Sequence, residues 1–280
     1  GDKVIVEGPT FLATIQCFRL YGAELISAPI DGNGVKTDEL EKLIAEHKPK
    51  FVYLIPTFGN PSGAMLSLER RKRVLELAVK YQTLIIEDDP YGELRFDGDK
   101  VPSLKSMDTK GNIIFLGSFS KILMPGLRIA WMVADPVIID KVVKLKQAVD
   151  LQSSSFGQRQ TSFFIDMYDL DAHVAKIKEL YKKRRDLMCD SMKEYFPEGI
   201  TFTYPEGGLF TWVTLPEGLD AKAMMPEVIE KKVAYVPGGA FYPNGGNANH
   251  FRLNYSNMPE DRIVEGIKRL AEVLKEKMGK

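Results

Sequence analysis

The chain has 280 residues, with 38 basic and 38 acidic side chains, so its formal net charge at pH 7 is zero. This balance lacks the basic footprint of proteins that bind nucleic acid or anionic membranes, and we expect neither as a partner. Apolar residues make up 44% of the chain, which predicts a sizeable core, but no segment approaches the roughly 20 consecutive apolar residues that span a membrane.

Short apolar runs alternate with helical patterns along the first half of the chain. We expect strands at residues 3–7, 23–30, 51–55, 83–86, 112–116 and 129–133. The intervening periodicity predicts helices at residues 10–21 and 68–81, and a third helix that Thr37 caps. The runs are continuously apolar rather than alternating, which is typical of strands in a mainly parallel α/β sheet that helices cover on both faces.

The pattern changes after Asp135-Pro136. Long amphipathic helices are predicted at residues 138–149, 158–167 and 171–196. Shorter elements follow, with strands at 200–204, 208–214, 233–236 and 251–255 and helices at 221–231 and 259–278. This combination predicts a second, smaller α+β domain. We therefore divide the chain into a large domain at residues 1–170, which includes a connecting helix, and a small C-terminal domain at residues 171–280.

Candidate chemical groups follow three of the expected parallel strands. Asn60, Asp88 and Lys121 each lie shortly after the end of one strand. Ligands of open α/β sheets bind beyond the carboxyl ends of the strands. We therefore expect these three side chains to meet in one crevice.

The segment from Gly117 to Arg128 places a lysine directly after a buried strand. A buried amine is unfavourable unless it has a role, and Lys121 could form an imine with a carbonyl cofactor, for which desolvation and nearby cations lower the amine pKa. Ser118, Ser120 and Arg128 are suited to binding the phosphate of such a cofactor. A surface turn with a solvated lysine is the structural alternative for this segment taken alone.

Asp88 and Tyr91 could serve the ring of a pyridine cofactor. A carboxylate at a strand end can pair with a protonated pyridine nitrogen, which makes the ring an electron sink. Tyr91 and Asn60 could hydrogen-bond a ring oxygen. Asp89 is a competing carboxylate, but the spacing to Tyr91 favours Asp88, and a simple turn around Pro90 is the structural alternative.

Arg252 lies inside the apolar strand expected at residues 251–255. A lone charge at such a position is unfavourable unless it is paired. The planar guanidinium could bind a substrate carboxylate through two hydrogen bonds, or it could form an internal ion pair.

Neither the cysteines nor the histidines suggest a disulfide framework or a metal site. Cys17 and Cys189 are far apart in sequence and lie in helical patterns, so we expect reduced core thiols and a cytoplasmic protein. His47, His173 and His250 lack the spacing of metal ligands, so we expect no metal ion.

Four motifs occur together in this chain. They are Asn60-Pro61-Ser62-Gly63, Glu87-Asp88-Asp89-Pro90-Tyr91, Ser118-Phe119-Ser120-Lys121 with Arg128, and Arg252-Leu253-Asn254. Their order and spacing resemble the class I/II aminotransferases, fold-type I enzymes that use pyridoxal 5′-phosphate (PLP). The resemblance extends from Gly1 to the C-terminus, and the stretches 87–96 and 117–131 are similar to aminoadipate, aromatic amino acid and kynurenine transaminases.

The resemblance implies a role for each candidate residue. Lys121 would form a Schiff base with PLP and later carry a proton, and Asp88 would pair with the pyridine nitrogen. Tyr91 and Asn60 would contact the ring hydroxyl oxygen, and Asn60 would also lie against the substrate. Ser118, Ser120 and Arg128 would hold the PLP phosphate. Arg252 would bind the substrate α-carboxylate.

The same resemblance implies transamination. The amino group of an amino acid, such as 2-aminoadipate or an aromatic amino acid, would pass to a 2-oxo acid such as 2-oxoglutarate in two half-reactions with ping-pong kinetics. Homodimers with sites at the interface are usual for the family. Two alternatives stay open: another fold-type I reaction, such as the β-elimination of a β-lyase, and the effector domain of a bacterial transcription regulator built on an aminotransferase fold.

The chain begins with Gly1-Asp2, without Met and without a signal peptide, and this start resembles the middle of a domain. The resemblance implies a longer chain in front of it, with a glycine-rich phosphate-binding turn, an aromatic residue that stacks on PLP and specificity elements. We therefore expect a large domain that is incomplete at its N-terminus. We also expect Ser118, Ser120 and Arg128 to form only part of the phosphate site and this chain to bind PLP weakly on its own.

Overall fold

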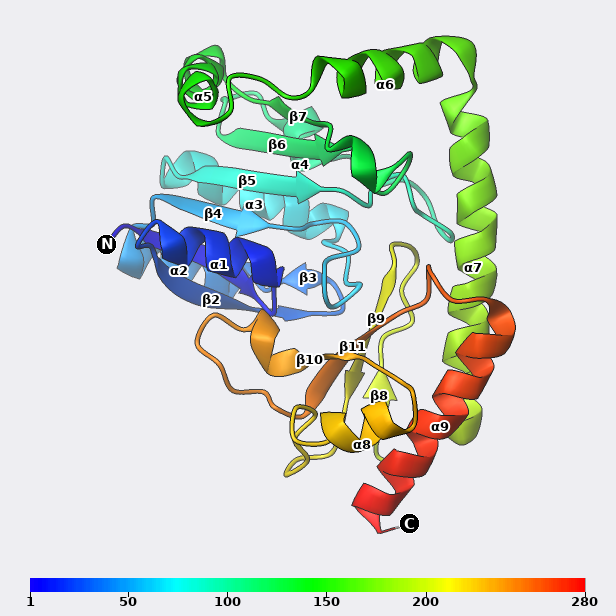
Figure 1. Cartoon of the computed structure of the whole chain (residues 1–280). Coiled ribbons are helices and arrows are strands. Elements are labelled where there is room, and N and C mark those ends of the chain that lie inside the picture. The colour runs from blue at the N-terminus through cyan, green and yellow to red at the C-terminus, as the bar shows by residue number, and fades with distance from the viewer. Residues whose placement is uncertain (280) are drawn as a thin grey trace.

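A seven-stranded sheet dominates the first part of the chain (Figure 1). Its strands are β1 (Lys3–Gly8), β2 (Glu24–Asp31), β3 (Gly34–Val35), β4 (Phe51–Leu54), β5 (Leu84–Asp89), β6 (Ile113–Ser118) and β7 (Ala130–Val133). The computed structural model describes residues 1–279 and orders these strands as β3-β2-β1-β4-β5-β6-β7. The five central strands are parallel to one another, and the edge strands β3 and β7 are antiparallel to their neighbours.

Helices cover both faces of this sheet because its strands present apolar side chains on both sides. The helices are α1 (Leu12–Leu20), α2 (Thr37–His47), α3 (Leu68–Lys80) and α4 (Leu104–Met107). Val52 and Leu54 point to one face and pack against α2, α3 and α4. Val6 and Tyr53 point to the other face and pack against α1. The expected mainly parallel sheet between helices is therefore confirmed, with antiparallel strands only at its edges.

A second, antiparallel sheet follows later in the chain. Its strands are β8 (Thr201–Phe202), β9 (Phe210–Thr214), β10 (Val236–Pro237) and β11 (His250–Asn254), in the order β10-β11-β9-β8. Its helices are α7 (Leu170–Tyr195), α8 (Met225–Glu230) and α9 (Glu260–Met278). Met192, Val213, Phe251 and Leu270 are buried together in the core between this sheet and the helices.

Long helices connect the two sheets. The chain passes from β7 through α5 (Pro136–Val149) and α6 (Ser155–Met167) into α7, which runs along the side of the molecule past both sheets (Figure 1). Val174 on α7 packs into a core cluster of the first sheet, and Met188 on the same helix packs into the core of the second. A domain boundary at residue 170, the first residue of α7, stays a prediction.

Backbone hydrogen bonds hold the second sheet against the carboxyl ends of the first sheet's strands. The Phe96 N–H donates to the Glu206 carbonyl (2.7 Å), and the Gly208 N–H donates to the Leu94 carbonyl (2.9 Å). The Thr10 N–H donates to the carbonyl of Phe241, the last residue of the 3-10 turn Gly238–Phe241 (2.9 Å). These contacts enclose the region in which the sequence places the candidate chemical groups.

Several local expectations are wrong. Helix α2 begins with Thr37 itself, and Lys36 at the cap position makes no side-chain cap hydrogen bond. The helix expected at 221–231 shortens to α8, with a proline in its first turn, and the strand expected at 233–236 forms only at Val236–Pro237. Residue Lys232 has a left-handed backbone (φ 60°), which ends α8 and delays the return to extended structure.

Cys17 is exposed, so the expectation that both cysteines are core thiols is wrong for this residue, whereas Cys189 is buried. Cys17 lies two positions after the buried Ile15, which places it roughly 200° around the axis of α1 and therefore on the outer side. No helix within residues 1–279 is long and apolar enough to cross a membrane. In the same part of the chain, no group of three or more His, Cys, Asp or Glu is placed to hold a metal ion.

Candidate active site

The carboxyl ends of β4, β5 and β6 form the centre of the candidate site. These strands are parallel neighbours, which places their ends about 5 Å apart. Asn60 follows β4, Asp88 is the penultimate residue of β5, and Lys121 lies three residues beyond the end of β6. The second sheet adds Arg252 from β11. The expected convergence of sequence-distant groups at one edge of the sheet therefore occurs.

Lys121 is half-buried at this edge. Burial lowers the pKa of its amine, and the positive charges of Arg128 and Arg252 lower it further. No carboxylate within the described residues offsets these effects. The segment is a turn, but the Lys121 amine is more easily neutralised than that of a fully solvated lysine.

The turn after β6 is held by a hydroxyl. The Ser118 Oγ accepts a hydrogen bond from the Ser120 N–H (3.0 Å). Arg128 has a left-handed backbone (φ 56°), and its Nη1 donates to the Pro125 carbonyl (3.1 Å). The side chain of Arg128 is exposed and lies at the rim of the site. The structure thus brings both serines next to Lys121, while Arg128 is near enough to act on Lys121 electrostatically.

Asp88 is oriented by a tyrosine that sequence reasoning did not identify. The Tyr53 hydroxyl on β4 donates a 2.5 Å hydrogen bond to Asp88 Oδ2, and the Thr14 hydroxyl on α1 donates to the Tyr53 oxygen (3.2 Å). Burial raises the pKa of the Asp88 carboxyl, and the hydrogen bond from Tyr53 opposes this rise. No basic side chain in the described part of the chain acts on Asp88. The carboxyl is therefore held in place without a counter-charge.

Arg252 reaches the site from the second sheet. Its Nη1 donates to Asn60 Oδ1 (2.7 Å), across 192 positions of sequence. The guanidinium carbon lies 4.1 Å from the centroid of the Phe210 ring, a cation–π contact. Its Nε is buried without a partner, and no carboxylate among residues 1–279 acts on it. The internal ion pair considered for Arg252 is therefore wrong, and its positive charge has no counter-ion among the described residues.

Tyr91 joins these groups. Its ring packs edge-on against Phe210, with the ring centroids 5.9 Å apart, and its hydroxyl hydrogen-bonds with Asn60. Burial raises the pKa of the hydroxyl, and the charge of Asp88 raises it further. The hydroxyl therefore keeps its proton at neutral pH and can donate a hydrogen bond.

Asp89 faces the opposite side of the sheet from Asp88, as adjacent residues of a strand do. The Gly92 amide donates to its carboxylate, and burial raises the pKa of Asp89 to about 6. Asp89 lines a separate cavity of about 440 Å³ together with Thr57 and Ser103. The two neighbouring carboxylates therefore belong to different sites, and only Asp88 contacts Tyr53.

Aromatic side chains were the residues that sequence reasoning missed. Tyr53 lies in the apolar run of β4, so the sequence pattern predicts a core residue. Its hydroxyl group among aliphatic neighbours was the signal that it needs a polar partner. Phe210 gives no signal because its contact with Arg252 depends on the pairing of β9 with β11. Phe11, just before α1, packs against the same apolar cluster as Tyr53 and Tyr91 and adds a ring at this edge.

Known proteins are similar to this chain over nearly its whole length. The family model described as "Aminotransferase class I and II" matches residues 1–270. Aromatic-amino-acid aminotransferase 1 of Thermococcus litoralis is 47% identical over 285 residues, which cover 100% of this chain and 68% of that protein. The 2-aminoadipate transaminase of Thermus thermophilus is 36% identical over 278 residues, which cover 98% of this chain and 70% of that protein.

A solved structure agrees with the fold as well. The crystal structure of Pyrococcus horikoshii kynurenine aminotransferase, in complex with PMP and with kynurenine among its ligands, matches with a TM-score of 0.97 at 48% identity. The match covers 99% of this chain and 70% of that chain. Both sheets and the helices between them therefore have the arrangement found in that enzyme.

Proposed function

Because the chain belongs to the class I and II aminotransferase family and is a PLP-dependent aminotransferase, we propose that its amino donor is an aromatic amino acid or 2-aminoadipate. The acceptor in this proposal is a 2-oxo acid such as 2-oxoglutarate. The names of the relatives that are 47% and 36% identical support these donors. The observation that carries the site assignment is the convergence of Lys121, Asp88 and Arg252 at one edge of the parallel sheet.

The chemistry of these side chains fits PLP. Asp88 is a buried carboxyl without a cationic partner, which suits a protonated pyridine nitrogen. Tyr91 and Asn60 are hydrogen-bonded to each other and would hold the ring oxygen. The phosphate would be held by Ser118, Ser120 and Arg128. When bound, PLP supplies an aldehyde carbon that condenses with amines and a ring that withdraws electrons from the substrate.

Lys121 is the proposed nucleophile and base. Its lowered pKa increases the fraction of neutral amine at neutral pH, and only the neutral amine can attack a carbonyl carbon or accept a proton. Lys121 Nζ would take the proton from the substrate Cα and hold it beside the reacting atoms. Tyr91, which stays protonated, would donate to the ring oxygen during this transfer.

Arg252 is the proposed site for the α-carboxylate of both substrates. Asn60 Oδ1 holds Nη1, and Phe210 lies against the face of the guanidinium. The guanidinium has no carboxylate partner among residues 1–279, so its charge would attract the carboxylate of a substrate. This arrangement suits transamination, in which an amino acid and a 2-oxo acid, each with an α-carboxylate, bind in turn at the same place.

Substitution of Arg252 by lysine should lower kcat/KM for an aromatic amino acid by roughly 100-fold, mainly through a higher KM. A lysine cannot form the paired hydrogen bonds of a guanidinium or its stacking contact with Phe210. Steady-state kinetics measure the effect, and Arg159→Lys, at an exposed position of α6, is the matched control. An unchanged KM in the Arg252 variant would remove Arg252 from the substrate site.

Substitution of Tyr53 by phenylalanine should weaken PLP binding by roughly tenfold. The lost hydrogen bond stabilises the charged form of Asp88, so its removal raises the pKa of Asp88 and weakens the pairing with a protonated ring nitrogen. Titration of the protein with PLP, followed by absorbance, gives the dissociation constants. The exposed Tyr21→Phe should bind PLP as the wild type does, and equal affinity of the Tyr53 variant would contradict the role of Tyr53.

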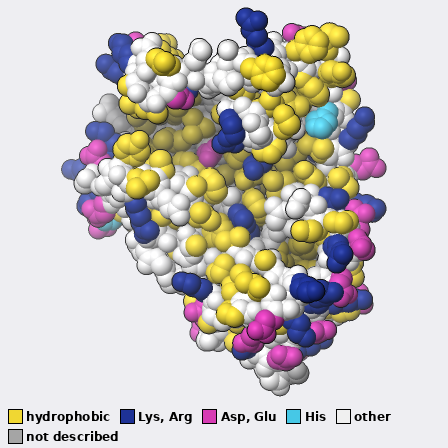
Figure 2. Space-filling view, in the orientation of Figure 1, with side chains coloured by type: hydrophobic (Ala, Val, Ile, Leu, Met, Phe, Trp, Pro, Cys, Tyr) yellow, Lys and Arg dark blue, Asp and Glu magenta, His cyan; other side chains and the backbone are white. Residues whose placement is uncertain are grey.

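We further propose that the protein is a cytoplasmic homodimer. Both cysteines are unpaired, which supports a reducing compartment. Helix α5 has no buried side chain, and apolar side chains on α5 and α6 gather on the upper part of the face in Figure 2. The exposed ones include Val137, Leu145, Val149, Phe156 and Phe163. Exposed apolar side chains on two successive helices support contact with a second copy of the chain.

Light scattering during size-exclusion chromatography should give twice the mass of the chain. The double variant Leu145→Lys and Val149→Lys should elute as a monomer, because it places two positive charges on the proposed contact. Leu20→Lys, on α1 and similarly exposed, should leave the dimer intact. A wild-type protein that stays monomeric at every concentration would rule out the homodimer.

A further inference from the structure

Arg252 carries a positive charge that no carboxylate neutralises. It lies on β11 and is only partly exposed, and burial lowers the pKa of its guanidinium. No acidic side chain among residues 1–279 acts on it, and its Nε is buried without a hydrogen-bond partner. The hydrogen bond from Nη1 ends on Asn60 Oδ1, which is a neutral acceptor. A partly desolvated charge of this kind is unfavourable unless other groups stabilise it.

Two buried aromatic rings lie against this charge. The guanidinium carbon of Arg252 is 4.1 Å from the ring centroid of Phe210 and 5.2 Å from that of Phe241. Both distances fall within the range of about 6 Å in which a ring face attracts a cation, and the attraction grows where water is excluded. Phe210 is 6% exposed and Phe241 is fully buried. We call these two rings the aromatic cage of Arg252, because they stand where an ion pair would have a carboxylate.

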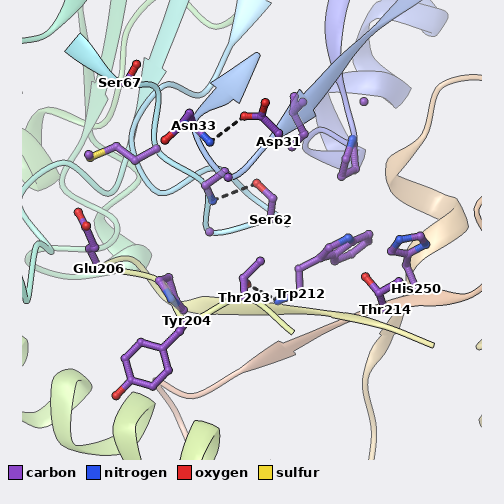
Figure 3. Close-up of a pocket in the computed structure, with 18 of the residues that line it drawn as sticks. Asp31, Asn33, Ser62, Ser67, Thr203, Tyr204, Glu206, Trp212, Thr214 and His250 are labelled. Atoms are coloured by element: carbon purple, nitrogen blue, oxygen red, sulfur yellow. Dashed lines mark hydrogen bonds between the residues drawn. The ribbon is translucent and has the colours of Figure 1, made fainter. Parts of the chain in front are cut away.

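Further aromatic contacts hold the rings of the cage. The Tyr91 ring meets Phe210 edge-on (5.9 Å, 85°), and the Trp212 ring meets Phe241 edge-on (5.6 Å, 88°). Trp212 is in turn stacked on His250, with centroids 5.5 Å apart, in the cleft between the two sheets that Figure 3 shows. Edge-on and offset stacked pairs are the arrangements that aromatic rings prefer. The rings of the cage are therefore held by packing as well as by Arg252.

The cage lies where the second sheet is joined to the first. The N–H of Thr10, in the loop after β1, donates to the Phe241 carbonyl (2.9 Å), and Asn60, after β4, accepts from Arg252 Nη1 (2.7 Å). Tyr91, which supports the cage, follows the end of β5. The guanidinium is therefore positioned against the carboxyl ends of the parallel strands, where the candidate active site lies.

A carboxylate in place of the cage would have a different consequence. It would neutralise Arg252 and accept its N–H groups, so that a substrate carboxylate could bind only by displacing it. Ring faces carry no net charge and are weak acceptors, so they stabilise the cation without neutralising it. An amino acid and a 2-oxo acid both carry an α-carboxylate, and in transamination they bind in turn. One guanidinium that keeps its charge could therefore serve both.

We propose that Phe210 and Phe241 are positioning residues for substrate binding: they hold the Arg252 guanidinium in place of a counter-ion, and so keep its charge for the α-carboxylate that both substrates share. This inference rests on the proposed role of Arg252 in binding that carboxylate. Loss of a ring should weaken the binding of both substrates by similar factors. It should leave kcat nearly unchanged, because the cage acts on the carboxylate rather than on the reacting carbon atoms.

Removal of each ring measures its share. Phe210→Leu should raise KM for an aromatic amino acid and for 2-oxoglutarate by roughly tenfold, and Phe241→Leu, whose ring is farther from the guanidinium, by roughly threefold. In both variants kcat should stay within about twofold of the wild type. Phe202→Leu, on β8 of the same sheet, is the matched control, because the Phe202 ring packs on Phe196 instead of Arg252. Unchanged KM in both cage variants, or a fall in kcat at unchanged KM, would overturn the proposal.

A fluorinated series separates electrostatics from packing. Phe210 is replaced, by site-specific incorporation, with phenylalanine that carries one, two or three ring fluorines, which withdraw charge from the ring face and change its shape little. The ligand is 3-phenylpropionate, a carboxylate without an amino group that could react with PLP, and calorimetry of the PLP-loaded protein gives its dissociation constant. This constant should rise with each fluorine, to roughly tenfold for the trifluorinated ring. Equal dissociation constants across the series would overturn the cation–π role of Phe210.

The same ligand separates this inference from the proposed function. Weaker binding in both Arg252→Lys and Phe210→Leu would support the cage. Weaker binding in Arg252→Lys alone would overturn the cage and leave the role of Arg252 intact, whereas unchanged binding in both variants, or no binding to the wild type, would overturn both. If the wild type binds 3-phenylpropionate but transaminates neither aromatic amino acids nor 2-aminoadipate, the proposed donors are wrong and the cage stands.

Discussion

Replacing Lys121 by alanine should lower kcat by roughly three orders of magnitude or more, because it is the only lysine between the end of β6 and the start of α5 that could act as nucleophile and base. The variant should also lack the absorbance band that PLP shows when it is joined to a lysine. Lys121 is half-buried, and no carboxylate in the described residues acts on it, so its removal should leave the free energy of unfolding nearly unchanged. Loss of activity would then report chemistry rather than folding.

Three measurements make this test specific. Single-turnover transamination, the absorbance spectrum with PLP and urea unfolding are compared between wild type and Lys121→Ala. Lys110→Ala, in an exposed turn before β6, should behave as the wild type does in all three. An unchanged spectrum in the Lys121 variant would assign the covalent role to another residue.

Glu7 should make the stability of the protein fall as pH rises. Its carboxyl is buried on β1, and Oε2 accepts a hydrogen bond from the Ile55 N–H at 2.8 Å. Burial raises the pKa of Glu7 from 4.5 to about 8, and no cation among residues 1–279 offsets this rise. The folded protein therefore holds the Glu7 proton in a pH range in which the unfolded chain has released it. This contribution is complete below pH 4.5 and is lost as pH rises to about 8.

Glu7→Gln should remove this part of the pH dependence. Glutamine keeps an oxygen that can accept the Ile55 N–H but cannot ionise, so the variant should match the wild type near pH 4.5. At pH 8 and above it should be more stable by a few kcal/mol, since each unit of pKa difference corresponds to about 1.4 kcal/mol. Urea unfolding from pH 5 to 9 measures the difference, with the exposed Glu24→Gln as control. Parallel pH profiles of the Glu7 variant and wild type would contradict this assignment.

Strand-end residues were predictable because they depend on local pattern. The runs that became β4, β5 and β6 are continuously apolar, and each ends where Asn60, Asp88 or Lys121 follows. Parallel strands bring their carboxyl ends to one edge whatever their order in the sheet, so convergence needed no knowledge of the topology. The spacing to Tyr91 likewise favoured Asp88 over Asp89 as the candidate carboxylate. The structure places Asp89 in a separate cavity on the opposite face of the sheet.

The wrong predictions concern positions at which tertiary packing, or a single backbone angle, outweighs the hydrophobic pattern of the sequence. The strand expected before Pro237 is nearly absent because the chain leaves α8 through a left-handed residue. Cys17 sits in a helical pattern, but only Ile15 of that helix is buried. Arg71 is fully buried beside Glu87, 3.6 Å away, and also donates to the Pro56 carbonyl (2.9 Å). No periodicity reveals such a charge, because its partners come from separate segments.

The amino-acid sequence by itself determined the parallel sheet, the edge of the sheet at which we propose that ligands bind, and the side chains that follow its strands. These features depend on hydrophobic period and chain direction, which any local window contains. Only the tertiary structure decided that Tyr53 orients Asp88 and that Arg252 rests on Asn60 and Phe210. Those contacts join segments up to 192 residues apart. They follow from strand order and from the docking of the second sheet, which are set by packing of the whole chain rather than by any single segment.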